Sequence, residues 1–192
     1  MREHLAFLAA RLMARDGIED YALAKRKAAR EAGMPETTGL PDNDEIEAAL
    51  RSYRELYQQD HPDLVRELRE LALELMDELQ GFAPHLTGTV LKGSAGHYAP
   101  IHLQLFTDSV KNVEHFLLNH DIRFQGGESR LYLGSEAIVA PTFSFQRDGI
   151  EIKLTVLSPR DQRAPLKTHL EGKPIERARR DAVARLIDQK LP

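Results

Sequence analysis

The chain has 192 residues, of which 42% are hydrophobic and 29% are charged, and its formal net charge is −4. This size and composition suit a chain with a buried core in one large domain or two small ones, and the negative charge argues against nucleic-acid binding over the whole surface. Because there is no cysteine, disulfides, thiol nucleophiles and cysteine-ligated zinc or iron–sulfur sites are excluded.

The N-terminal part, residues 1–81, is predicted to be helical. Apolar residues recur there at the three- and four-residue spacing of amphipathic helices. Asp42 and Glu45 have the spacing of a capping box, and the segment 33–41, rich in glycine and proline, is predicted to be a loop. We expect helices at residues 4–14, 18–31, 42–57 and 62–81. The buried face of the third is predicted to comprise Ile46, Leu50, Tyr53 and Tyr57.

The remainder, residues 82–192, is predicted to form a mixed sheet with flanking helices. Period-two alternation of apolar residues indicates strands, and Arg147-Asp148-Gly149 has the composition of a hairpin turn. The segment 158–174 is predicted to be a loop. The expected strands are 86–91, 101–105, 122–124, 130–133, 138–145 and 150–156. Helices are expected from a cap at Thr107 or Asp108 and over 175–189. The predicted fold class is therefore α+β.

A glycine–serine turn between two predicted strands carries the main functional signal. Leu91-Lys92-Gly93-Ser94 ends the first, and Ala99-Pro100-Ile101-His102-Leu103 begins the second. A glycine allows close backbone approach, and the N–H groups and hydroxyl of such a turn can hold an anion.

This arrangement resembles the polymerase-β-like nucleotidyltransferase superfamily over roughly residues 62–157. In that superfamily a strand ends in a Gly-Ser turn, and the next strand carries Asp-x-Asp, which binds catalytic Mg²⁺. The resemblance implies a nucleotidyltransferase-like sheet. It also implies that Pro100 and His102 replace the two metal-binding carboxylates, and that Lys153 lies near the third acidic position, on a neighbouring strand.

The candidate site residues follow from this resemblance. We expect Lys92, Gly93, Ser94 and Lys153 to bind a nucleotide or phosphate, and His102 and Glu151 to be the catalytic candidates. Most of them have a simpler alternative: Gly93-Ser94 as an ordinary tight turn, His102 as a polar pocket histidine, and Glu151 and Lys153 as solvent-facing strand residues.

No metal site is predicted, and the sequence does not identify a cofactor. Proline offers no ligand, imidazole suits Mg²⁺ poorly, and one remaining carboxylate does not hold a two-metal site. A metal pair formed by His97 and His102 is an alternative that lacks a third ligand.

Three functions are compatible with these observations. The first is a nucleotide-binding or regulatory module with a degenerate two-metal site, with oligomerisation through the N-terminal helices as an option. The second is an active nucleotidyltransferase with a site rearranged around Ser94, His102 and Glu151. The third is RNA or DNA binding by the basic C-terminal segment, which lacks the interleaved aromatic residues of single-strand binders.

Several other classes are set aside. There is no P-loop motif and no G-x-S-x-G elbow. No apolar run approaches the ~20 residues of a membrane helix, and the charged N-terminus does not read as a secretory signal. We therefore expect a cytoplasmic protein without membrane segments.

Overall fold

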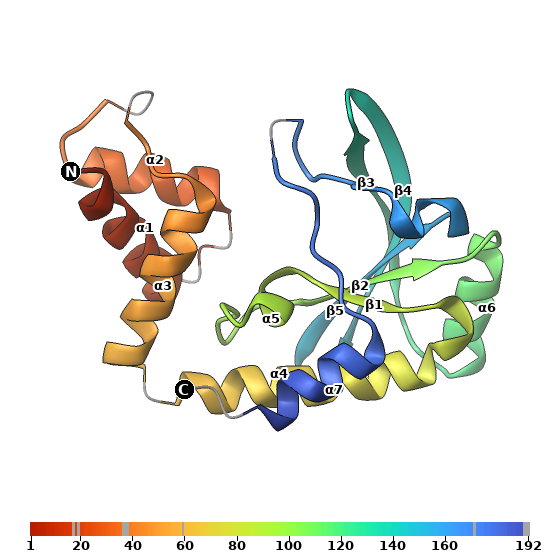
Figure 1. Cartoon of the computed structure of the whole chain (residues 1–192). Helices are drawn as coiled ribbons and strands as arrows, with labels where there is room; N and C mark the ends of the chain where they lie inside the picture. The colour runs from red at the N-terminus through yellow and green to blue at the C-terminus, as the bar shows by residue number, and fades with distance from the viewer. Residues whose placement is uncertain (17, 19, 36–38, 59, 171, 190–192) are drawn as a thin grey trace. The chain divides into compact units, whose positions relative to one another are not determined.

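The computed structural model describes all residues except 17, 19, 36–38, 59, 171 and 190–192 (Figure 1). The residues left out include residue 19 of the predicted helix 18–31. They also include residues 36–38 of the predicted loop 33–41 and residue 171 of the predicted loop 158–174. By their contacts, the residues form two compact units: Met1–Val65 with Ser94–Ala99, and Arg66–Gly93 with Pro100–Pro192. The sequence prediction places the boundary after residue 81, where the predicted helices end. The contacts instead place the boundary after Val65 and assign Ser94–Ala99 to the first unit.

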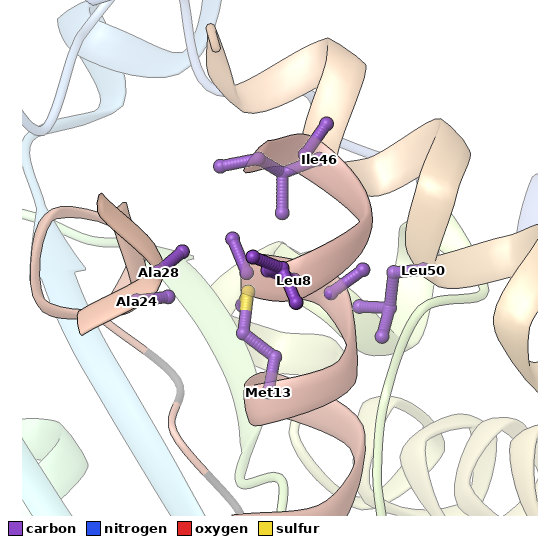
Figure 2. Packing of buried hydrophobic residues seen from close by; sticks show 9 residues of the cluster. Leu8, Met13, Ala24, Ala28, Ile46 and Leu50 are labelled. Atoms are coloured by element: carbon purple, nitrogen blue, oxygen red, sulfur yellow. The ribbon is translucent and has the colours of Figure 1, made fainter. Parts of the chain in front are cut away.

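The first unit, called here the helical unit, contains α1 (Arg2–Asp16), α2 (Tyr21–Glu31) and α3 (Asn43–Tyr57). Their small and aliphatic side chains form one core, in which Ala24 and Ala28 of α2 face Leu8 and Met13 of α1 (Figure 2). The predicted capping box is confirmed, because Asp42 accepts from Glu45 N and Glu45 accepts from Asp42 N.

The structure corrects two details of the predicted helices. Tyr57, predicted to be buried, is 66% exposed at the end of α3. The second predicted helix begins at Tyr21 and not at Ile18, because the Asp20 side chain accepts from Leu23 N and caps it.

The second unit, called here the sheet unit, contains a five-stranded sheet in the order β1-β2-β5-β4-β3. Only β2 and β5 are parallel, and the other neighbouring strands are antiparallel, so the predicted α+β class with a mixed sheet is confirmed. The strands are β1 (His85–Thr87), β2 (Ile101–Phe106), β3 (Gln125–Leu133), β4 (Glu136–Arg147) and β5 (Ile150–Leu157).

Helices complete the sheet unit. These are α4 (His61–Glu78, grouped with this unit from Arg66), α5 (Gly88–Lys92), α6 (Val110–Asn119) and α7 (Arg180–Asp188), with the short 3₁₀ helices η1 (Gln80–Phe82) and η2 (Pro159–Arg163). Helix α7 lies alongside α4 in Figure 1, where Arg180 forms an ion pair with Asp77. Arg147 of β4 forms a two-point contact with Glu78 and so ties the sheet to α4.

Alternation along β2 and β5 separates the two faces of the sheet. Ile101, Leu103 and Leu105 of β2 are fully buried, as are Ile152 and Leu154 of β5. The residues between them project to the opposite face and are polar. No helix among the described residues is long and apolar enough to span a membrane.

Several strand and helix predictions are wrong. The predicted strand 86–91 is a three-residue strand followed by the helical turn α5. Residues 122–124 precede β3, which contains Gly126 and Gly127 instead of ending at them. Helix α6 is capped by Ser109, and the last helix begins at Arg180.

Candidate functional site

A row of polar residues crosses the sheet perpendicular to its strands. His102 of β2 is paired with Thr87 of β1 on one side and with Lys153 of β5 on the other. Ser144 of β4 is paired with Lys153 and with Gln125 of β3. Since paired residues project from the same face of a sheet, these five side chains share one face. We call them the polar row.

His102 is neutral near pH 7. Its pKa is lowered from the usual 6.5 to about 4, mainly by burial and in smaller part by the neighbouring ammonium of Lys153. The carboxylate of Glu151 opposes this effect. A neutral imidazole both donates and accepts one hydrogen bond, so His102 can orient a polar ligand without adding charge.

Gly88 brings the chain close to His102. It directly follows β1 and has a φ of 76°, a left-handed conformation that favours glycine. A Cβ at this position would lie 3.3 Å from Cδ2 of His102. The residue that adjoins His102 after the first strand is therefore Gly88, and sequence reasoning missed it by extending the strand to Leu91.

Glu151 and Lys153 form a partly exposed ion pair. Their charged atoms are 3.5 Å apart, and each side chain is 40% exposed. They are two positions apart in β5, with Ile152 between them, and therefore project from the same face. Exposed ion pairs contribute little free energy, about 0–1 kcal/mol, so an incoming anion can exchange with Glu151 at small cost.

A groove continues from the polar row toward the start of β5. It has a volume of about 670 Å³, within the range of small-molecule sites. Its lining includes the polar residues Gln125, Ser144 and Gln146 and the charged residues Asp121, Arg123, Arg147 and Glu151.

The predicted phosphate turn is divided between the two units. Gly93 has a φ of 79° and ends α5, so it acts as the C-terminal cap of that helix. Beside it, Arg69 donates to the carbonyl oxygens of Val90 and Leu91. Lys92 of α5 is exposed.

Ser94 belongs to the helical unit. Its side chain is buried next to the Tyr21 hydroxyl, without a hydrogen bond of regular geometry. The Arg54 guanidinium donates to the Ser94 carbonyl, and burial lowers the pKa of Arg54 to about 10. In this structure the Ser94 hydroxyl is therefore closed to a ligand, and a joint phosphate-binding role with Gly93 stays a prediction.

No metal centre is assembled from the described residues. Nowhere among them do three or more histidine, aspartate or glutamate side chains gather as metal ligands. His97 belongs to the helical unit and His102 to the sheet unit.

Part of the basic C-terminal segment is used within the sheet unit. Arg177 donates to the side chain of Gln104 at 2.6 Å and to three backbone carbonyls. Arg180 forms an ion pair with Asp77 of α4. These two arginines therefore hold the C-terminal segment against the sheet and against α4.

No known family, curated protein or solved structure matches the chain. The site must therefore be interpreted from its own chemistry.

Proposed function

We propose that the sheet unit binds a nucleotide on the polar face around His102 and Lys153, as a nucleotidyltransferase-like module without two-metal chemistry. The pairing of His102 with Lys153 carries this proposal. In the superfamily that the sequence resembles, carboxylates at these positions grip Mg²⁺. Here they correspond to a neutral imidazole and an ammonium, which suit the phosphate itself better than a cation.

The surrounding groups support an anionic ligand of nucleotide size. Lys153 exchanges its weak ion pair with Glu151 for a phosphate oxygen, and a charge-assisted hydrogen bond of this kind contributes about 1.5–3 kcal/mol. The adjacent groove takes the rest of the ligand, and Gln125, Ser144 and Gln146 bind its polar atoms.

The test is calorimetric titration of the full chain with ATP, CTP, GTP and UTP, in EDTA and then in Mg²⁺ or Mn²⁺. We expect binding in EDTA, weakened about ten- to a hundredfold by Lys153→Gln, because one charge-assisted contact is lost. Lys111→Gln, which removes an exposed lysine from α6, is the matched control and leaves the affinity unchanged.

Two results would overturn the proposal. If none of the four nucleotides binds under any condition, the polar face is not a nucleotide site. If binding requires the metal and is abolished by His102→Ala, an active enzyme with a rearranged site replaces the binding module.

A further inference from the structure

Helix α2 of the helical unit has two chemically distinct faces. Ala24, Ala28 and Ala29 are fully buried, and Figure 2 shows the first two directed toward α1. At 3.6 residues per turn, the opposite face carries Leu23, Arg26, Lys27 and Arg30, and all four are exposed. We call the last three residues the α2 basic face.

The case for this face rests on two of its cations, Arg26 and Lys27. Within the described part of the chain, Arg26 and Lys27 make no ion pair. The single carboxylate of α2, Glu31, forms an ion pair with Arg11 of α1. Lys25 lies apart from the face, since it is half-buried and interacts electrostatically with Asp42.

We propose that the α2 basic face docks on the phosphate backbone of duplex DNA. The cations lie within about 6 Å along the helix, at 1.5 Å per residue, and form a compact positive surface for closely spaced phosphates. The proposal concerns the helical unit and does not depend on nucleotide binding by the sheet unit.

The shape and composition of the α2 basic face favour B-form duplex DNA over duplex RNA and single strands. An α-helix about 10–12 Å across fits the B-form major groove, which is about 12 Å wide, whereas the A-form groove of RNA is too narrow. No aromatic side chain lies on the face, so bases of a single strand find no stacking platform there. The face contains cations and one leucine, which predicts backbone binding with little sequence preference.

The experiment is fluorescence anisotropy of the full chain with a labelled B-form duplex, repeated from about 50 to 200 mM salt. Phosphate contacts by Arg26 and Lys27 predict a slope of log K against log salt of about −1.8, at about 0.9 per contact. The double variant Arg26→Gln/Lys27→Gln is expected to bring the slope close to zero and to weaken binding at least about tenfold at the lowest salt. Glutamine preserves helix propensity, and circular dichroism checks that the helices remain.

A charge-matched control removes two exposed cations of the sheet unit, Lys111→Gln/Arg130→Gln, and is expected to leave both slope and affinity unchanged. An equal loss in the two double variants would overturn the proposal, because net charge alone would then explain binding. Absence of binding at about 50 mM salt, tighter binding to single-stranded DNA or duplex RNA, or binding only to phosphatidylserine vesicles would overturn it as well. None of these outcomes affects the calorimetric test of the sheet unit.

Discussion

The contact between Gly88 and His102 gives a prediction with a built-in control. Gly88 and Gly149 have nearly the same backbone dihedral φ, 76° and 78°. An alanine Cβ at Gly88 would lie 3.3 Å from the His102 ring, whereas at Gly149 it would have no neighbour within 4 Å. Comparing the two alanine variants therefore separates backbone strain from the contact with His102.

The expected losses in unfolding free energy follow from the backbone strain and from the contact with the His102 ring. A left-handed conformation costs an alanine about 1–2 kcal/mol, and both variants lose that stability. At Gly88 the half-buried His102 ring must also shift, and crowding of this kind adds about 1 kcal/mol or more. We expect Gly88→Ala to destabilise the sheet unit by about 2–3 kcal/mol and Gly149→Ala by about 1–2 kcal/mol.

The assay is urea unfolding followed by the amide NMR signals of β2 and β5, combined with nucleotide titration of each folded variant. Gly88→Ala is expected to lower nucleotide affinity and to shift the ring signals of His102, and Gly149→Ala to change neither. Equal destabilisation by the two substitutions, with equal nucleotide affinity, would show that Gly88 does not set the position of His102.

The remaining predictions concern titration and a buried hydrogen bond. Because the pKa of His102 is about 4 in the folded protein and 6.5 in its usual environment, the unfolded chain binds the extra proton between these pH values. Stability therefore falls as the pH decreases from about 6.5 to 4, by up to about 3 kcal/mol from this group. Urea unfolding at several pH values should show a smaller decrease for His102→Gln, and an unchanged pH dependence would contradict the assignment. In the helical unit, the Tyr21 hydroxyl donates to the buried Glu47 carboxylate at 2.7 Å, so Tyr21→Phe is expected to cost about 1.5–3 kcal/mol in thermal or urea unfolding. The control Tyr57→Phe, at an exposed tyrosine, should stay within about 0.5 kcal/mol, and similar losses in both would refute the role of the hydrogen bond.

Features fixed by short-range chemistry could be predicted from the sequence. The Asp42–Glu45 capping box involves residues three apart, and both of its hydrogen bonds are present. The Asp148-Gly149 turn is confirmed as a two-residue hairpin connection in which both residues have positive φ. The alternation in β5 is strict because one of its faces is fully apolar.

Features that depend on distant partners could not be predicted in the same way. The residues after Thr87 alternate like a strand, yet β1 ends there, because Gly88 adopts a left-handed conformation and the chain continues as α5. The sequence of Gly126 and Gly127 predicts an interruption between two strands. Both residues instead pair with β4, within a ladder that extends over the whole of β3.

The candidate site was predictable only in outline. The resemblance predicts that β5 neighbours β2, and the two strands are adjacent, in a register that pairs His102 with Lys153. The contributions of Ser144 and Gln125 depend on the pairing of β3 and β4, which sequence spacing does not encode. The burial of Ser94 in the helical unit likewise has no local signal, because it requires Arg54, which lies 40 residues away.

The most direct test of the central claim is the NMR signal of the His102 ring during titration with ATP in EDTA. We predict that this signal shifts saturably without metal, that Lys153→Gln suppresses the shift, and that the exposed His115 of α6 does not respond. A His102 signal that stays unchanged at saturating ATP, or moves only when Mg²⁺ or Mn²⁺ is added, would contradict metal-free nucleotide binding on the polar face.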